Sequence, residues 1–574
     1  MRCIDPEKII PISRSTTEVF KTGAWGSGRP EHLEKVSACR AACPDGNNIT
    51  KALFKASQGD LDGALSAFLE ESPLPGVCGS VCYHPCEDHC NRGQWDGEVS
   101  IRALERAASE LGTALPGLLT RDGRDHPVAV VGSGPAGLSA AYHLARMGHP
   151  ITLIESEDEL GGLLRWGIPQ YRLPQNVLER DMARILSLDI RVRTNTRVDA
   201  QMLAELRATH RAVFIAAGAQ KSQGLDILGT DLDGVFPGVD FLKDVRRDSI
   251  KDLPGKVVVI GGGNVAIDAA LTALRLGAER VELVCLERQD EMPAHGRECE
   301  DALEEGIVFH NGWGPRNILE QDGRSAGVEF IRCTSVFDRD GRFSPSYDES
   351  TVLKRDADWV IPAIGQAPDL SFLEGSGIPG GALTVNDQTM ETAVQNVFAG
   401  GDVVQTPGSV VESIASGKQA ALAIHIYSRG MPFSEAEEKV RLGEGPGFSI
   451  EALFHPRAGW DRRSVVRFED LEPLFLDLQA PVTLPRLDSA LRVKGFEEIN
   501  QPLNMDDAIR VAGRCFFCGT CTGCDRCFIY CPEICITPPR EDHGPYSADP
   551  EYCKGCAVCA AVCPRGVMTM GEGT

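Results

Sequence analysis

Eight cysteines near the carboxyl terminus restrict the fold of this chain more than any other feature. They form two complete runs with the spacing C-x2-C-x2-C-x3-C-P, beginning at Cys521 and Cys553. In modules with two [4Fe-4S] clusters, the first three cysteines of each run bind one cubane and the fourth binds the other. Paired CxxC motifs also occur in zinc sites, but three cysteines at this spacing followed by Cys-Pro favour iron–sulfur clusters. The predicted ligand sets are Cys521, Cys524, Cys527 and Cys563 for one cluster, and Cys553, Cys556, Cys559 and Cys531 for the other.

The remaining composition points to a cytoplasmic metalloprotein. Twenty-one cysteines in a secreted chain would indicate disulfides, but the sequence begins without a signal-peptide pattern, so we expect metal ligands instead. The net charge of −24 argues against nucleic acid as the main partner. No apolar run approaches the roughly 18 residues that a membrane span needs.

Residues 127–155 predict a first dinucleotide-binding unit. An apolar strand leads into Gly132, Gly134 and Gly137, an alanine-rich helix follows, and a second strand ends at Glu155. The glycines let the backbone approach a pyrophosphate at the helix N-terminus, and the acid is placed to bind a ribose hydroxyl. An isolated GxGxxG is a weak signal, but a strand, a helix and a terminal acid around it argue against a chance glycine turn.

Residues 253–288 repeat this pattern with Gly261, Gly263 and Ala266. Their second strand ends near Glu287 and Arg288; an acid there favours the 2′-hydroxyl of NAD, whereas an arginine favours the 2′-phosphate of NADP. Because apolar strand-and-turn segments resume afterwards, we predict that the second domain is nested in the first. The predicted fold class is multidomain α/β: two nested Rossmann-like domains, an α-helical N-terminal iron–sulfur domain and a C-terminal α+β bacterial-type ferredoxin domain.

The segment at 160–181, the GSGPAG and GGGNVAID loops, and the AGGD that precedes a helix resemble the flavoprotein small subunit of glutamate synthase. They are also similar to the flavin-containing half of dihydropyrimidine dehydrogenase and to the large subunit of the NADH-dependent ferredoxin:NADP oxidoreductase. The resemblance covers about residues 35–430 and implies FAD in the first site and NAD(P)H in the second. The family usually has two arginines where this chain has Glu287-Arg288, so NADH is favoured over NADPH.

The resemblance also implies which residues contact each cofactor. The FAD residues would be Gly132, Gly134, Pro135, Ala136, Gly137, Glu155, Gly162, Leu163, Ile168, Arg172, Ala217, Gly401, Asp402 and Val411, with Gly162, Leu163, Ile168 and Arg172 near the flavin ring. The NAD(P) residues would be Gly261, Gly263, Asn264, Val265, Glu287, Arg288 and Gly365.

Six cysteines between residues 39 and 90 form a second group. Cys39-x3-Cys43-Pro is followed by cysteines at every fourth position from 78 to 90. In the family that the chain resembles, the cysteine of the Cys-Pro pair and the last three of this series bind one [4Fe-4S] cluster. The resemblance therefore assigns to a third cluster Cys43, Cys82, Cys86 and Cys90.

The same family has another amino-terminal cluster, whose first two ligands lie in an RCxxCG stretch just before the equivalent of Cys39. This chain lacks that pair there, but the pattern occurs at Cys515 and Cys518, outside the ferredoxin ligand sets. We hypothesise that Cys39, Cys515 and Cys518 bind a fourth cluster, with Cys78 or Glu105 as the fourth ligand. The carboxyl-terminal segment would then fold back onto the amino-terminal domain. The alternative is that they are packing cysteines. No ligand role is assigned to Cys3, Cys285, Cys299, Cys333 and Cys535.

These features predict an electron-transfer subunit of a larger redox complex, without a catalytic acid, base or nucleophile of its own. A flavin between nicotinamide and clusters converts paired electrons into single ones. The partner would be a 2-oxoacid, aldehyde or aromatic acyl-CoA oxidoreductase subunit, or ferredoxin; the alternatives are a glutamate synthase (NADPH) small subunit, a stand-alone NAD(P)H:acceptor reductase, or a non-enzymatic scaffold. The predicted domains are 1–120 (helical, [4Fe-4S]), 121–250 with 365–430 (FAD), 251–364 (NAD(P)), 431–500 (bridging segment) and 501–574 (ferredoxin).

Overall fold

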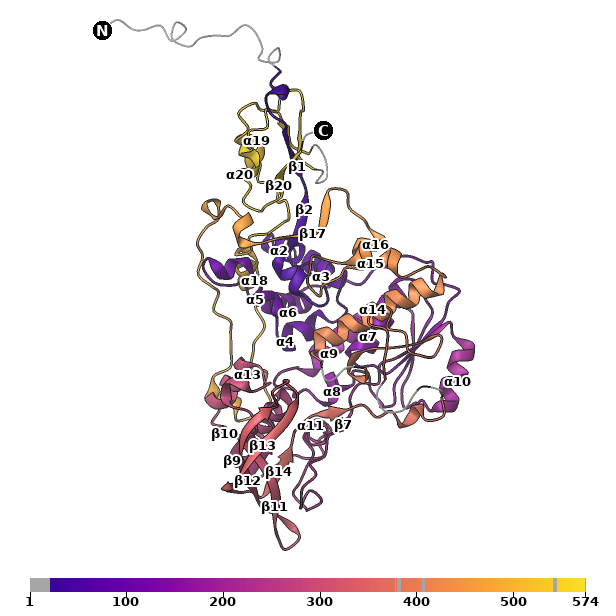
Figure 1. Ribbon diagram of the computed structural model, residues 1–574, viewed down its shortest axis with the longest axis vertical. Helices are drawn as coiled ribbons and strands as arrows, with labels where there is room; N and C mark the ends of the chain where they lie inside the picture. The colour runs from indigo at the N-terminus through magenta and orange to yellow at the C-terminus, as the bar shows by residue number, and fades with distance from the viewer. Residues whose placement is uncertain (1–20, 377, 379–382, 405–407, 540–544, 573–574) are drawn as a thin grey trace, which may run out of the picture.

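The computed structural model describes residues 21–376, 378, 383–404, 408–539 and 545–572, and Cys3 lies outside this range. An amino-terminal group of helices forms the centre of the molecule (Figure 1). Its apolar core also includes Leu503, Val511 and Phe517 from the far end of the chain. The helices are α1 (Ala38–Ala42), α2 (Ile49–Ser57), α3 (Leu61–Leu69), α4 (Pro75–Val81), α5 (Pro85–Asp88), α6 (Ile101–Leu111) and, from the far end, α18 (Met505–Gly513).

A five-stranded parallel sheet with the strand order β16-β6-β3-β4-β5 forms the first Rossmann-type unit. All residues of β3 are buried, as expected for a strand covered on both faces. Helices α7 and α14 pack side by side on this sheet. The elements are β3 (Val128–Val131), β4 (Ile151–Ile154), β5 (Ile190–Arg193), β6 (Ala212–Ile215), β16 (Val397–Ala399), α7 (Pro135–Arg146), α8 (Leu163–Trp166), α9 (Gln175–Leu186), α10 (Ala200–Thr209) and α14 (Val410–Ser428).

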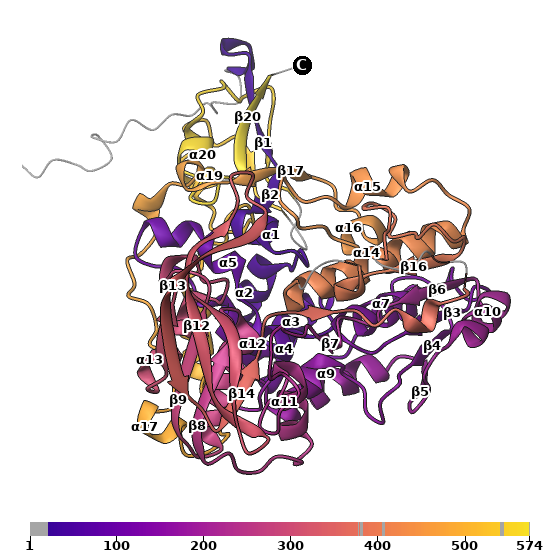
Figure 2. The same ribbon diagram turned by 60° about the horizontal axis from the view of Figure 1, so that its bottom comes forward.

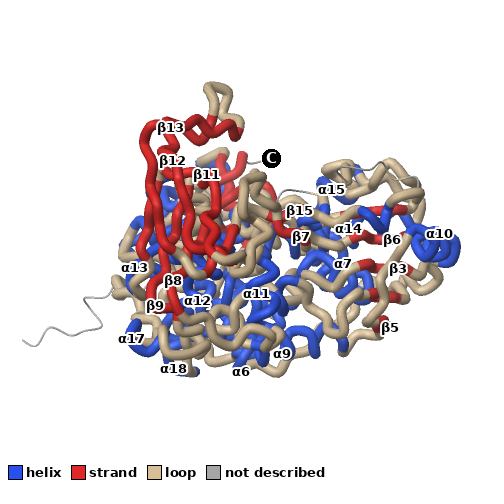
Figure 3. Tube along the Cα trace, turned by 90° about the horizontal axis from the view of Figure 1, so that it is seen from below, coloured by secondary structure: helices blue, strands red, loops and turns tan. Residues whose placement is uncertain are grey.

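A second parallel sheet, with the order β10-β9-β8-β14, comes from the chain between β6 and β16. An antiparallel sheet of β11, β12 and β13 lies beside it, and a short β7–β15 pair joins the two Rossmann-type units (Figure 3). The elements are β7 (Lys221–Ser222), α11 (Gly238–Arg246), β8 (Gly255–Ile260), α12 (Asn264–Arg275), β9 (Ala278–Cys285), α13 (Gly296–Glu304), β10 (Val308–Asn311), β11 (Trp313–Gln321), β12 (Arg324–Phe337), β13 (Phe343–Asp356), β14 (Trp359–Pro362) and β15 (Gln366–Ala367).

The carboxyl-terminal residues return to the amino-terminal ones. Strand β20 pairs antiparallel with β1, and β17 pairs parallel with β2, so both ends of the described chain meet at one end of the molecule (Figures 1 and 2). The elements are β1 (Gly28–His32), β2 (Glu34–Ser37), α15 (Ser434–Val440), α16 (Glu451–Phe454), β17 (Trp460–Val466), α17 (Ser489–Arg492), α19 (Arg526–Ile529), β18 (Ile536–Thr537), β19 (Ser547–Ala548), α20 (Val558–Ala561) and β20 (Met568–Glu572).

Short 3-10 turns connect these elements at η3 (Gly23–Trp25), η4 (Asn91–Gln94), η5 (Gln289–Glu291), η6 (Ser371–Leu373), η7 (Gly401–Val403), η8 (Phe468–Asp470) and η9 (Pro473–Phe475). Within the described part of the chain, none of the helices combines the length and the apolar character needed to cross a bilayer.

Candidate functional site

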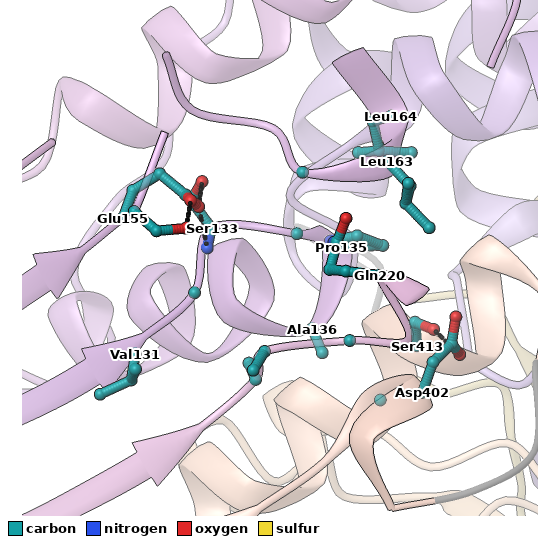
Figure 4. Close-up of a pocket in the computed structure, with 18 of the residues that line it drawn as sticks. Val131, Ser133, Pro135, Ala136, Glu155, Leu163, Leu164, Gln220, Asp402 and Ser413 are labelled. Carbon is teal, nitrogen blue, oxygen red and sulfur yellow. Dashed lines mark hydrogen bonds between the residues drawn. The ribbon is translucent and has the colours of Figure 1, made fainter. Parts of the chain in front are cut away.

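A cavity of about 410 Å³ opens where β3, β4 and β6 of the first sheet end (Figure 4). This edge is where ligands bind in open α/β sheets. It is also lined by Val410, Ser413, Gln220 and Lys243, which the sequence analysis did not predict. The predicted FAD residues that line it are Gly132, Gly134, Pro135, Ala136, Glu155, Gly162, Leu163, Ile168, Ala217, Gly401 and Asp402.

The glycine loop after β3 is shaped by close backbone contacts. Gly132 has φ 101°, and a Cβ there would lie 2.3 Å from the carbonyl oxygen of Ala216. A Cβ on Gly137 would lie 1.9 Å from the carbonyl oxygen of Gly132, so this glycine serves packing and does not line the cavity. A Cβ on Gly134 would meet nothing within 4 Å, and this glycine precedes the first turn of α7. The free backbone N–H groups of this turn suit an anionic pyrophosphate.

Glu155 fixes the glycine loop through hydrogen bonds with Ser133. Its carboxylate accepts hydrogen bonds from the backbone N (2.9 Å) and Oγ (2.5 Å) of Ser133 (Figure 4). The Ser156 hydroxyl and the Glu157 backbone N donate to its other oxygen, each at 3.0 Å. An ionised carboxylate has about four acceptor positions, and these four protein donors occupy them here, so a ribose hydroxyl that binds Glu155 would replace one of the two serine hydroxyls.

Asp402 closes the opposite end of the cavity. Its Oδ1 accepts from Gly408 N and Ser413 Oγ, both at 3.3 Å (Figure 4). Burial raises the pKa of this carboxyl. Helix α14 starts beside it with a capping box between Ser409 and Glu412, so its N-terminus faces the cavity. Val411, predicted as an FAD residue, is instead buried in the core and is not among the lining residues.

Arg172 is not among the residues that line this cavity, although the resemblance places it near the flavin ring. It pairs with Asp268 at 2.7 Å and with Glu298, and it joins the two Rossmann-type units. Burial alone would lower the pKa of Arg172, but the two carboxylates outweigh burial and hold it well above the ordinary value. The motif around Arg172 could not reveal this pairing, because both partners lie in the second unit.

The second glycine loop follows β8. Gly261 has φ 142°, and a Cβ there would lie 2.3 Å from the Ala363 carbonyl oxygen; Gly263 is open and caps α12. Asn264, the first residue of α12, donates to the Tyr83 hydroxyl and accepts from His295 N.

Glu287 and Arg288, the acid and the base that follow β9, point in different directions. A Cβ on Gly262 would lie 2.6 Å from Oε2 of Glu287, so this carboxylate hangs over the glycine loop. Arg288 is 70% exposed and pairs with Glu291 at 2.8 Å. Of the other predicted nucleotide residues, Val265 packs against the core of this unit, and Gly365 accepts a backbone hydrogen bond at the β7–β15 crossing.

The carboxyl-terminal cysteines surround two separate small cavities. One is lined by Cys521, Cys524, Cys527 and Cys563, and the other by Cys531, Cys553, Cys556 and Cys559. These are the two sets expected from the interleaved spacing. Cys535, which received no role, lines the second cavity as well.

The amino-terminal cysteines form two groups that differ from the predicted ligand sets. Cys90 lies with Cys39, Cys515 and Cys518 around one cavity, and not with the set to which the resemblance assigned it. Asn91 donates to Cys518 Sγ at 3.4 Å beside this cavity. The remaining cysteines form a neighbouring group near Glu105, consisting of Cys43, Cys78, Cys82 and Cys86.

Among the described residues, no three His, Cys, Asp or Glu side chains converge on the position of one metal ion. The thiols around each cavity are the ligand type that [4Fe-4S] clusters require.

Two family matches cover the two glycine loops and the amino-terminal cysteines. Residues 126–417 match the family described as pyridine nucleotide-disulphide oxidoreductase, and residues 34–114 match dihydropyrimidine dehydrogenase domain II, 4Fe-4S cluster. The chain belongs to the pyridine nucleotide-disulphide oxidoreductase family. Together the two matches make it an NAD(P)H-dependent oxidoreductase subunit with a flavin domain and an iron–sulfur domain.

Curated relatives of this family member are themselves subunits. The chain is 34% identical over 511 residues to the NADP(+)-dependent formate dehydrogenase subunit beta of Moorella thermoacetica, covering 84% of this chain and 70% of the relative. It is 33% identical over 501 residues to the NADPH-Fe(3+) oxidoreductase subunit beta of Geobacter sulfurreducens, covering 78% and 74%. It is 33% identical over 423 residues to the glutamate synthase [NADPH] small chain of Azospirillum brasilense, covering 69% and 87%.

Proposed function

We propose that this subunit passes electrons between NADH, FAD and four [4Fe-4S] clusters, and that a separate subunit or ferredoxin exchanges electrons with the last cluster. The observation that carries this proposal is the order of the cysteine groups. Neighbouring groups share short stretches of chain, which keeps each close to the next. The pairs that connect them are Cys43 with Cys39, Cys518 with Cys521, and Cys527 with Cys531.

The flavin cavity connects to the first of these groups through one buried contact. Helix α14 begins at the cavity, and its Lys418 donates to the carbonyl oxygen of Asp45 at 2.6 Å, two residues after Cys43. When bound, FAD exchanges electrons in pairs with a nicotinamide and singly with clusters. The protein positions it: the loop at Gly134 faces the pyrophosphate, Glu155 holds the ribose, and the α14 N-terminus closes the site.

We assign NADH as the preferred nucleotide. The Glu287 carboxylate over the glycine loop is placed to accept hydrogen bonds from a free 2′-hydroxyl and would repel a 2′-phosphate. Arg288, the residue that could bind that phosphate, is engaged with Glu291 at the surface. The relatives from Moorella thermoacetica and Geobacter sulfurreducens carry NADP names, so this assignment distinguishes the present chain from them.

Two amino-terminal clusters have revised ligand sets. The shared cluster, which joins the two ends of the chain, is assigned Cys39, Cys90, Cys515 and Cys518. Its neighbour is assigned Cys43, Cys82 and Cys86, with Glu105 as the fourth ligand.

Glu105 suits this role better than Cys78. Its carboxylate is buried and, within the described part of the chain, accepts a hydrogen bond from the neutral Asn47. Burial, with Asp45 and Asp181 nearby, raises the pKa of this carboxyl well above its ordinary value. The raised pKa keeps the carboxyl neutral when no cation is near it, and a bound iron would favour the ionised form that ligates metal. Cys78 packs in the apolar core as a neutral thiol.

The domain boundaries given above and a cytoplasmic location form part of this proposal. The partner would be the catalytic subunit of a 2-oxoacid, aldehyde or aromatic acyl-CoA oxidoreductase, or ferredoxin. The fused carboxyl-terminal module supports this over a glutamate synthase small subunit, because such a subunit would end after its flavin domain.

Anaerobic iron and flavin analysis, followed by stopped-flow reduction with NADH and NADPH, tests the proposal. We expect about sixteen irons and one FAD per chain, with flavin bleaching before the clusters are reduced. About twelve irons would remove the shared cluster. Absence of reduction by either nucleotide would overturn the electron-transfer function.

A further inference from the structure

The two halves of the carboxyl-terminal module repeat each other at positions 32 residues apart. Gly523 and Gly555 have φ 68° and 69°, and Ile534 and Gly566 have φ 51° and 67°. The two cluster cavities therefore have matching backbones around them, and differences between them arise from side chains.

One such difference lies next to a cluster ligand. Cys535 follows Cys531 by four residues, and the matching residue after Cys563 is Val567. Cys535 is 7% exposed and lines the cavity of Cys531, while Val567 is 2% exposed and lines the cavity of Cys563. The chain thus places a thiol in one half and an apolar group in the other, at equivalent positions.

The thiol is within hydrogen-bond distance of the ligand. Cys531 Sγ and Cys535 Sγ lie 3.5 Å apart. A cysteine that binds a cluster is a thiolate and can only accept, so the donor of this pair must be Cys535. Hydrogen bonds to ligand sulfurs are among the factors that set the reduction potential of an iron–sulfur cluster.

We propose that Cys535 is a tuning residue: its S–H donates to Cys531 Sγ and raises the reduction potential of the cluster bound by the second cavity above that of its partner. The donor stabilises the extra negative charge that the cluster gains on reduction. Val567 cannot donate, so the other cluster lacks this stabilisation. The inference rests on the proposed two-cluster module and adds that its two clusters are unequal, with electrons favoured on the cluster in the cavity of Cys531 and Cys556.

The test is an anaerobic redox titration of the full-length protein, followed by electron paramagnetic resonance. Replacing Cys535 with valine, the residue of the other half, should shift the reduction equilibrium of one cluster about tenfold toward the oxidised form, equivalent to about 59 mV for one electron. Cys535→Ser keeps a donor and should retain most of the parent potential. Val567→Cys should raise the potential of the other cluster.

The outcomes separate the two proposals. Unchanged midpoint potentials in Cys535→Val with full iron content would overturn the tuning role, and so would loss of about four irons, which would make Cys535 a ligand. If Cys535→Val fails to fold, Val567→Cys still decides, because an unshifted potential there contradicts the mechanism. A parent protein without reducible clusters in this module would overturn the proposed function itself.

Discussion

Lys418→Met should loosen the contact between the flavin unit and the amino-terminal helices. Lys418 is fully buried, with its Nζ 2.7 Å from Glu71 Oε2 and 3.6 Å from Asp45 Oδ1. It also donates to the carbonyl oxygens of Asp45 (2.6 Å) and Phe448 (3.0 Å). Three distant parts of the chain therefore meet on one ammonium group.

Methionine approximates the size of lysine but removes the cation that faces Asp45 and Glu71. Asp45 loses this ion pair, whereas Glu71 keeps its pair with Arg40 at 3.5 Å. Removing one partner of a buried ion pair costs about 3–5 kcal/mol, because the other charge stays buried and unpaired. At about 1.4 kcal/mol per factor of ten, this raises the equilibrium constant for local opening by a factor of between about 10² and 10⁴. Local opening is the appropriate quantity, since a multidomain protein with cofactors does not unfold in two states.

Hydrogen exchange of backbone amides in α14 and α3 measures this change. We expect protection in both helices to fall by that factor, while the β11–β13 sheet keeps the parent rates. Lys256→Met is the matched control, because its pair with Asp356 is exposed and should contribute less than about 1 kcal/mol. The double variant Lys418→Met/Asp45→Asn should recover part of the loss, because it removes the carboxylate that the single variant leaves unpaired. Parent-like protection in Lys418→Met would refute the view that this buried cation holds the units together.

Three further changes test other parts of the site. Glu287→Ala should raise the KM for NADH about 10- to 100-fold, the equivalent of about 1.5–3 kcal/mol for a hydrogen bond to a charged group. It should lower the KM for NADPH, because the charge that repels the 2′-phosphate is gone, and equal losses for both nucleotides in steady-state kinetics would contradict the assignment. Glu105→Ala should lose about four irons by chemical analysis, whereas Cys78→Ala should keep them, and the reverse result would exchange their roles. Burial, followed by the nearby His149, lowers the pKa of His425 in the folded state to about 4, below its unfolded value near 6.5. The contribution of His425 to stability is therefore complete above pH 6.5 and is lost as the pH falls toward 4. The loss is on the order of 3 kcal/mol, and a His425→Gln variant with the same acid dependence of thermal unfolding would argue against it.

Local spacing predicted those parts of the site whose residues lie on one continuous stretch. The first glycine loop, its helix and Glu155 occupy about thirty consecutive residues, and steric limits on glycine fix their geometry almost independently of the rest of the chain. The carboxyl-terminal cysteine runs behave similarly, since their spacing alone separates the eight cysteines into the two sets that the structure brings together. In both cases, contacts close in the sequence decide the arrangement.

Arg172 and Cys90 show where that reasoning fails. The surroundings of Arg172 depend on Asp268 and Glu298, which a nested second unit brings to it, and no local pattern records that docking. Cys90 is four residues from Cys86, but a short helix ends between them, so Cys90 lines the cavity of the shared site while Cys86 lies near Cys43 and Cys82. The position of Cys515 and Cys518 depends on where α18 packs, because they follow α18 directly in the chain and α18 packs against the amino-terminal helices. The shared site is therefore a property of tertiary packing, and only the cysteines missing from their usual place in the sequence pointed to it.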